Sequence, residues 1–309
     1  MKAAIAIVGS GFIGRGWAAR FASAGATVRL WDSNPAAPGA ALRWLDETLP
    51  AMEKLGLITD AAGARARATA CTTLEEALAG VDYVQENAPE DLALKRDLHR
   101  RIDAADCASA VVGSSTSTFP GSRIFGGLRG AARCLVAHPA NPPHLLPVVE
   151  LVPTPDTAPE ALARCRSLMQ EAGQVPVLLK KEIEGFVMNR LQAGVICEAI
   201  SLVADGVIEP DDLDAVIRHS LGLRWSFMGP FETIDLNAPD GVTDYAARYG
   251  HTYAEVSKTQ ADNRWDAGVI SRIETERRQK LRHDELSARA RWRDNRLMAL
   301  RRHQQDQPT

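Results

Sequence analysis

Short apolar runs alternate with longer amphipathic stretches along the first part of the chain. The runs are rich in β-branched residues, which is typical of strands buried on both faces of a parallel sheet. The predicted strands are Ala3–Val8, Thr27–Trp31, Tyr83–Glu86, Ala110–Gly113, Cys134–His138, Val148–Val152 and Val175–Leu179. The clearest helical patterns between them are Phe12–Ala24, Ala40–Leu55, Asp91–Ala105 and Pro159–Ala172. This alternation predicts an α/β fold with a mostly parallel, Rossmann-type sheet.

The strand signals end after Lys181. An apolar-periodic stretch opens at Gly185 and continues to about Ala204, which is too long for a strand and predicts a buried helix. Mostly helical patterns continue to the end of the chain. We therefore expect a Rossmann domain at residues 1–184, followed by an all-helical C-terminal domain at residues 185–309.

The net charge and the cysteine content of the chain exclude several kinds of binding partner. The 36 Lys and Arg residues against 39 Asp and Glu residues give a net charge of −3, so there is no broad basic field for nucleic acid. No segment reaches the roughly 20 apolar residues that span a bilayer. The five cysteines lie far apart and form no CxxC pair, which is typical of reduced thiols in a cytoplasmic protein. We expect no nucleic-acid partner, no membrane partner and no bound metal.

A glycine-rich turn follows the first predicted strand, and a helical pattern follows the turn. In such turns the first glycine allows a tight bend, the second lets the backbone approach a pyrophosphate, and the third lets helix and strand pack closely. The N-terminus of the helix offers unpaired N–H groups to the phosphates. The residues expected to hold a dinucleotide here are Gly9, Gly11, Phe12, Ile13 and Gly14.

Asp32 directly follows the second predicted strand, 18 residues beyond Gly14. An acidic residue at that position can accept hydrogen bonds from the ribose hydroxyls of the cofactor. A hydrogen bond to a charged acceptor is worth about 1.5–3 kcal/mol. Because a carboxylate there would also repel the 2′-phosphate of NADP, we expect the cofactor to be NAD.

An ordered set of further motifs follows the glycine turn. They are Ser114–Thr118 (SSTST), His138–Pro142 (HPANP), Val149–Val152 (VELV) and Gly185–Arg190 (GFVMNR). This set resembles the 3-hydroxyacyl-CoA dehydrogenase family. Three more segments resemble the branch of that family that contains the lambda-crystallins, so the resemblance covers nearly the whole chain. These segments are Gln85–Leu92, Leu223–Pro230 and Ala290–Asp294.

The resemblance implies an NAD-dependent dehydrogenase in which His138 is the general base. A histidine suits this task because its unperturbed pKa of about 6.5 lies near working pH. Glu150, twelve residues further on in the next predicted strand, would hold the imidazole tautomer and stabilise its charged form. The alternative for each residue is a purely structural hydrogen bond or ion pair. His144 lies in the Pro-rich loop and could line the site, whereas the five other histidines, His99 among them, are expected at the surface or in helices.

Five further residues match positions that the family uses in its active site. Ser117 and Asn189 match the residues that hydrogen-bond the reacting oxygen and the base, and Asn141 matches a contact to the nicotinamide end. Glu90 and Lys95 look like contacts on the adenosine side of the cofactor. The alternative for that pair is a solvent-facing ion pair.

Arg224 is the candidate cation for a substrate carboxylate, because a guanidinium binds carboxylates in bidentate fashion. The alternative is a structural salt bridge. The resemblance implies a small 3-hydroxy acid as substrate, with L-gulonate as the first expectation and L-carnitine or a 3-hydroxyacyl-CoA as alternatives. It also implies a homodimer formed through the helical domain. From another class of function, the chain could be an NAD-binding structural protein of the crystallin kind without turnover.

Overall fold

The computed structural model describes residues 1–105, 107, 109–260 and 265–307. By internal packing the chain divides into two compact units, one formed by Met1–Arg190 with Asp294–Thr309 and one formed by Leu191–Arg293. The expected domain ranges, 1–184 and 185–309, stay a prediction.

The first unit is built on one sheet with the strand order β3-β2-β1-β4-β5-β6-β7-β8. Its strands are β1 (Ala4–Val8), β2 (Thr27–Trp31), β3 (Ala68–Ala70), β4 (Tyr83–Glu86), β5 (Val111–Ser114), β6 (Cys134–Pro139), β7 (Val148–Pro153) and β8 (Val175–Leu178). Among the described residues, every pair of neighbouring strands is parallel except the antiparallel pair β6 and β7. The predicted α/β fold class with a Rossmann-type, mostly parallel sheet is confirmed.

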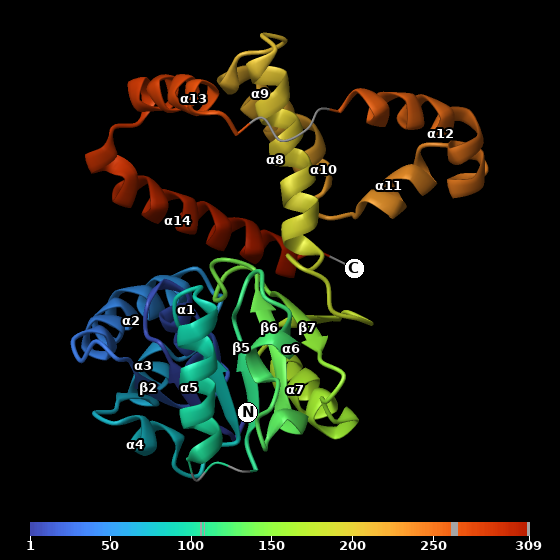
Figure 1. The fold of residues 1–309 in the computed structure, drawn as a ribbon. Coiled ribbons are helices and arrows are strands. Elements are labelled where there is room, and N and C mark those ends of the chain that lie inside the picture. The colour runs from blue at the N-terminus through green and yellow to red at the C-terminus, as the bar shows by residue number, and fades with distance from the viewer. Residues whose placement is uncertain (106, 108, 261–264, 308–309) are drawn as a thin grey trace. The chain divides into compact units, whose positions relative to one another are not determined.

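Helices cover both faces of this sheet (Figure 1). They are α1 (Phe12–Ser23), α2 (Ala37–Lys54), α3 (Ala61–Ala66), α4 (Leu74–Leu78), α5 (Leu92–Ala104), α6 (Gly121–Phe125) and α7 (Pro159–Glu171). Strand β1 shows why two cores form, since its side chains alternate between the faces. Ile5 and Ile7 belong to the core that contains Trp17 of α1, whereas Ala6 and Val8 belong to the opposite core.

The parallel strands bring the candidate residues to one edge of the sheet, because their carboxyl ends all meet there. Gly9 follows β1, Asp32 follows β2, Asn87 follows β4 and Ser115 follows β5. His138 is the last residue but one of β6. This edge is therefore where a ligand site is expected in such a fold.

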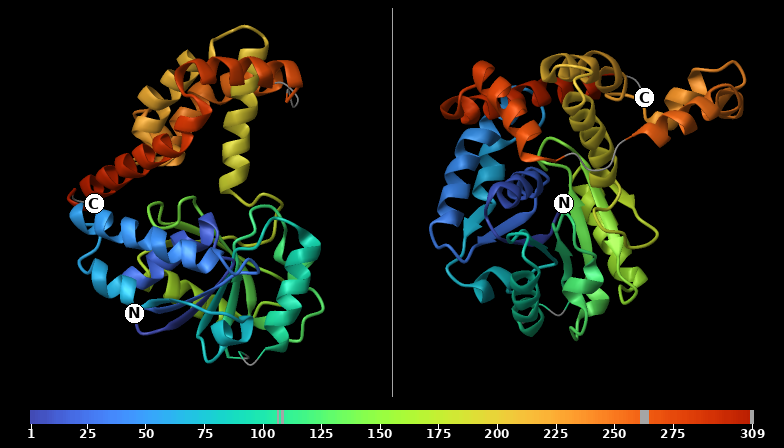
Figure 2. Two further views of the ribbon diagram at one scale, coloured as in Figure 1. Left: turned by 90° about the vertical axis from the view of Figure 1, so that its left-hand side faces the viewer. Right: turned by 45° about the horizontal axis from the view of Figure 1, so that its top comes forward.

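The second unit is helical, in agreement with the predicted all-helical second part. The helices of the chain from residue 188 onward are α8 (Met188–Ala204), α9 (Pro210–Val216), α10 (Gly222–Arg224), α11 (Pro230–Leu236), α12 (Gly241–Thr259), α13 (Ala267–Lys280) and α14 (Leu286–Gln305). Figure 2 shows the same helices from two further directions. Within this unit Arg272 of α13 pairs with Glu209 at 2.7 Å. Over the described part of the chain, no helix has the length and apolar run needed to cross a membrane.

Candidate active site

The turn at residues 9–14 has the geometry of a phosphate cradle. Gly9 has φ of 93°, and a Cβ there would lie 2.8 Å from the carbonyl carbon of Asn87, so only glycine fits. A Cβ on Gly14 would collide with the carbonyl oxygen of Gly9. A Cβ on Gly11, in contrast, would meet no atom of the described residues within 4 Å. The turn is thus closed toward the protein and open where a pyrophosphate would approach.

The start of α1 and the end of β2 complete this cradle. Gly11 is the N-cap residue of α1, and no side chain of the described residues caps the helix there. Its first N–H groups are therefore available to an anion. Asp32 accepts the N–H of Ser10 at 2.7 Å and the N–H of Asn34 at 2.9 Å. The bond from Ser10 ties the half-buried carboxylate of Asp32 to the glycine turn. Together these groups fit a dinucleotide whose ribose carries free hydroxyls.

His138 and Glu150 form a buried pair in the neighbouring part of the sheet. The antiparallel register of β6 and β7 places the two residues directly opposite each other. The Nδ1 atom of His138 lies 2.9 Å from Oε2 of Glu150, and both residues are at least nine-tenths buried. The pair that the sequence suggested is thus in hydrogen-bonding contact.

The start of α8 holds the other oxygen of Glu150. The N–H groups of Val187 and Met188 donate to its Oε1 atom at 2.8 and 2.9 Å. Burial alone would raise the pKa of Glu150, but the hydrogen bonds from His138 and from these two amides outweigh it and hold the pKa below its ordinary value. An ionised Glu150 can only accept, so Nδ1 of His138 carries a hydrogen and its Nε2 atom is free to take a proton.

Two residues with left-handed backbone bring those amides to Glu150. Gly185 has φ of 72° and Phe186 has φ of 51°. For a bulky residue this conformation costs on the order of 1–3 kcal/mol and persists only where the surroundings require it. The Phe186 ring is fully buried, and its centroid lies 5.3 Å from that of the His138 ring. Neither the strained turn nor the two amides was expected from the sequence.

Ser117 and Asn189 also meet in the structure. The side-chain amide of Asn189 donates to the backbone carbonyl of Ser117 at 2.8 Å. The resemblance implied that this amide contacts the reacting oxygen or the base, whereas here it holds the loop of Ser117. Asn141 is exposed, just beyond the end of β6.

Arg224 belongs to the helical unit, where it is the last residue of α10. Its Nε atom is buried without a hydrogen-bond partner in the described part of the chain. No carboxylate of the described residues forms a salt bridge with it, so nothing in that part of the chain supports the alternative of a structural ion pair.

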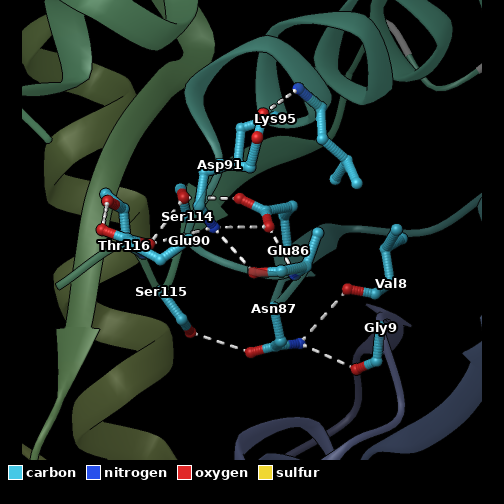
Figure 3. A network of polar contacts seen from close by, with 12 residues as sticks. Val8, Gly9, Glu86, Asn87, Glu90, Asp91, Lys95, Ser114, Ser115 and Thr116 are labelled. Carbon is cyan, nitrogen blue, oxygen red and sulfur yellow. Dashed lines mark hydrogen bonds and ion pairs between the residues drawn. The ribbon is translucent and has the colours of Figure 1, made fainter.

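Lys95 belongs to a buried polar network around the end of β4, and Glu90 lies at the exposed edge of that network (Figure 3). Lys95 is only 1% exposed, so the alternative of a solvent-facing pair is wrong for it. Its ammonium lies 3.0 Å from Glu86, 3.5 Å from Glu90 and 3.0 Å from the carbonyl of Ala88. His99 lies in a helix, as expected, but it is buried with Nε2 3.2 Å from Glu86.

Sequence reasoning passed over Glu86 and His99. One signal was available, because Lys95 and His99 are four residues apart and so lie on one face of α5. The acidic residue at the end of the predicted strand, Glu86, could have been matched to that face. Among the described residues, no group of three or more His, Cys, Asp or Glu side chains could hold a metal ion.

Comparisons with known proteins show which family the chain belongs to. Residues 4–183 match the family model of the 3-hydroxyacyl-CoA dehydrogenase NAD binding domain, and residues 185–277 match that of the C-terminal domain. The lambda-crystallin homolog of Bos taurus is 42% identical over 302 residues, which are 96% of this chain and 94% of the relative. The L-carnitine dehydrogenase of Pseudomonas putida is 41% identical over 246 residues, 79% of this chain and 76% of the relative.

Two solved structures extend the comparison. A 5-formyl-3-hydroxy-2-methylpyridine 4-carboxylic acid 5-dehydrogenase, described as an NAD⁺-dependent dismutase, has a TM-score of 0.85 at 29% identity and covers 100% of both chains. A (S)-3-hydroxybutyryl-CoA dehydrogenase from Ralstonia eutropha has a TM-score of 0.66 at 27% identity, over 82% of this chain and 88% of that one. With both domain models matched along the chain, this protein is an NAD-dependent oxidoreductase that belongs to the 3-hydroxyacyl-CoA dehydrogenase family.

Proposed function

We propose that this enzyme oxidises the 3-hydroxyl group of a small hydroxy acid, with His138 as the general base. The observation that carries the proposal is the buried hydrogen bond of 2.9 Å between His138 and Glu150. Glu150 is itself fixed by two backbone amides. An imidazole with a fixed tautomer and one free nitrogen is suited to accept a proton from an alcohol.

NAD, when bound, supplies the acceptor for the hydride that leaves the carbinol carbon. As that hydride departs, the hydroxyl proton moves to Nε2 of His138 and the C–O bond becomes a carbonyl. The resulting imidazolium carries a positive charge that the Glu150 carboxylate stabilises. General base catalysis of this kind contributes typically about 10²–10⁴-fold.

We propose that the cofactor binds at the glycine turn and the start of α1. Gly9, Gly11 and Gly14 would admit the pyrophosphate, and the N–H groups at Phe12 and Ile13 would donate to it. Asp32 would accept from the ribose hydroxyls. Asn141, which is exposed beyond β6, is proposed to contact the nicotinamide end.

Ser117 is proposed to hydrogen-bond the reacting oxygen of the substrate. The residue is half-buried, and Asn189 holds its backbone carbonyl at 2.8 Å. We assign Asn189 to the same site through this bond. A hydroxyl can donate to the oxygen that loses its proton and so keep that oxygen directed at the base.

For the substrate we propose a small 3-hydroxy acid whose carboxylate binds Arg224. The buried, unpartnered Nε atom of that guanidinium supports a role in binding an anion. A relative named L-carnitine dehydrogenase, whose named substrate is a free hydroxy acid, matches 79% of the chain and favours this substrate class. We propose L-gulonate first, with L-carnitine and a 3-hydroxyacyl-CoA as the other candidates.

The test is NADH formation with L-gulonate, L-carnitine, L-3-hydroxybutyrate and 3-hydroxybutyryl-CoA. Turnover with one of the three free acids that exceeds turnover with the thioester supports the proposal. Turnover with the thioester alone overturns the assigned substrate class. NAD binding without turnover on any of the four compounds contradicts the dehydrogenase proposal and favours a structural, crystallin-like role.

We also propose that the enzyme is a cytoplasmic homodimer. The five cysteines are all unpaired in the structure, which agrees with a reducing compartment. Light scattering coupled to size-exclusion chromatography gives the mass in solution, and the mass of a single chain of 33.5 kDa would contradict the dimer.

A further inference from the structure

One carboxylate oxygen holds three consecutive residues of the loop after β5. The Oε1 atom of Glu90 accepts hydrogen bonds from the hydroxyls of Thr116 at 2.6 Å and Thr118 at 2.7 Å. It also accepts the backbone N–H groups of Ser117 and Thr118, each at 3.0 Å. Hydrogen bonds to an ionised acceptor are about twice as strong as those between neutral groups, so Glu90 holds this loop in place.

The peptide group between Ser117 and Thr118 is held at both of its ends. Its N–H, from Thr118, donates to Glu90, and its carbonyl, from Ser117, accepts from Asn189 at 2.8 Å. With the N–H of Ser117 also bound to Glu90, the backbone of this residue has little freedom left. The Ser117 hydroxyl is therefore carried on a rigid support.

The carboxylate of Glu90 is stabilised by two linked ion pairs, which run through Lys95 to Glu86. Its Oε2 atom lies 3.5 Å from the ammonium of Lys95, and Lys95 lies 3.0 Å from Glu86. Glu86 is fully buried and accepts from Ser114 at 2.5 Å, with His99 at 3.2 Å. Burying a lysine ammonium without partners costs free energy, and the oxygens of Glu86 and Ala88 remove that cost. These contacts hold the ammonium of Lys95 next to Glu90.

Electrostatics agree with an ionised Glu90. Burial alone would raise the pKa of Glu90, but the hydrogen bonds from Thr116 and Thr118 and the charge of Lys95 outweigh it and lower the pKa. At neutral pH Glu90 is therefore a carboxylate that can accept all of these bonds.

We propose that Glu90 is a positioning residue, which sets the place of the Ser117 hydroxyl in the active site and is supported by Lys95 and Glu86. This inference rests on the proposed function, in which Ser117 contacts the reacting oxygen. It differs from the role that the family resemblance implied, a contact of Glu90 and Lys95 with the adenosine side of the cofactor. Lys95 is 1% exposed and surrounded by protein oxygens, which leaves it no free donor surface for a cofactor.

Glu90→Ala and Glu90→Gln are the variants that test the proposal. Because a misplacement of about 1 Å can cost about 10²-fold in rate, we expect Glu90→Ala to lower kcat about 10- to 100-fold at saturating NAD. Glu90→Gln keeps an acceptor oxygen but turns an amide NH₂ toward Lys95, so its kcat should fall between the wild type and Glu90→Ala. The affinity for NAD should change less than about 2-fold in both variants.

Asp103→Ala is the matched control. Asp103 is likewise a carboxylate that accepts two backbone amides, from Arg129 at 2.9 Å and Gly130 at 3.0 Å, and it pairs with Arg133. It lies in the last turn of α5, at the end of that helix opposite Glu90. We expect this variant to lose stability and to keep its kcat. An equal loss of kcat in Asp103→Ala would overturn the positioning role.

A milder variant covers the case in which Glu90→Ala does not fold. Thr118→Val removes one donor to Glu90 and keeps the charges, so we expect a decrease in kcat of only about 2- to 5-fold with NAD affinity unchanged. A rise in the dissociation constant for NAD of about 10-fold or more, with kcat intact at saturating NAD, would make Glu90 a cofactor contact and overturn the proposal.

Amide hydrogen exchange, measured without substrate, separates this inference from the proposed function. Exchange at Ser117 and Thr118 should be faster in Glu90→Ala than in the wild type, because both amides donate to Glu90. Unchanged exchange overturns the inference whichever substrate is turned over. Faster exchange in a protein that oxidises none of the four compounds supports the anchoring of the loop and contradicts the proposed function alone.

Discussion

His138 and Glu150 face each other across the one antiparallel strand pair described in the sheet, with Nδ1 and Oε2 2.9 Å apart. The second oxygen of Glu150 accepts two amides at the start of α8. Strand register thus brings the two side chains together, and a helix start keeps the carboxylate ionised. The proposed chemistry depends on this arrangement.

Replacing Glu150 by glutamine removes the negative charge of the side chain and keeps its shape, so the variant tests the role of the charge alone. The amide oxygen can still accept from Val187 and Met188, but no negative charge remains to stabilise an imidazolium. By comparison with other acid–histidine pairs, we expect kcat to fall roughly 10²–10⁴-fold with NAD affinity nearly unchanged. Steady-state kinetics and NAD titration check this. A kcat within about 3-fold of the wild type would show that the charge is not needed.

Glu86 should make stability depend on acidic pH. Burial would raise its pKa, but His99, Lys95 and Ser114 together lower the pKa from 4.5 to about 2. Because the pKa of Glu86 is lower in the folded than in the unfolded protein, its ionised carboxylate stabilises the fold at pH values above about 4.5. This stabilisation is lost as the pH falls from about 4.5 toward about 2. At 1.36 kcal/mol per pKa unit, the contribution at neutral pH is on the order of 3 kcal/mol.

Urea unfolding of Glu86→Gln at several pH values measures this contribution. At pH 7 the variant leaves Lys95 and His99 without their carboxylate, and breaking such a buried pair costs about 3–5 kcal/mol. The difference from the wild type should shrink as pH falls below about 4.5. Glu75→Gln, at an exposed position of α4, is the control and should change stability by less than about 0.5 kcal/mol. A difference that stays constant with pH would contradict the assignment.

Asp32→Asn should relax the choice between NAD and NADP. The asparagine oxygen can keep the hydrogen bond from Ser10, so the turn stays in place while the charge is lost. A hydrogen bond to a charged group is worth about 1.5–3 kcal/mol, so NAD affinity should fall about 10- to 100-fold. Affinity for NADP should fall less or rise. An unchanged ratio of the two dissociation constants would exclude Asp32 from the ribose site.

Arg224→Met tests the proposed carboxylate contact. We expect kcat/KM for the hydroxy acid to fall about 10- to 100-fold, chiefly through KM, and NAD affinity to stay the same. Arg248→Met is the control, because Arg248 is an exposed arginine in the same helical unit, paired with Asp244 four residues away. If the two variants had equal kcat/KM, Arg224 would not bind the substrate.

Much of the sheet could be predicted from the sequence because most of its strands are short runs rich in apolar and β-branched residues. Each of the seven predicted strands is present, with ends that differ by one residue at most. Strand β3 was missed because its three residues at the sheet edge carry no pattern. The short helices α3, α4 and α6 were missed for the same reason, since five or six residues make fewer than two helical turns.

The polar interior of the site could be predicted only in part. His138 and Glu150 were found because neighbouring strands fix their register. The burial of Lys95 and His99 depends on Glu86, which is nearby only after β4 and α5 have packed. Charged residues in a helix ordinarily indicate a solvated face, so sequence periodicity alone points the wrong way here.

The most direct test of the account is the kinetics of His138→Ala with the best hydroxy acid and saturating NAD. We predict that kcat falls about 10²–10⁴-fold while the dissociation constant for NAD changes less than about 2-fold. A variant that keeps the kcat of the wild type would contradict His138 as the base, and with it the proposed mechanism.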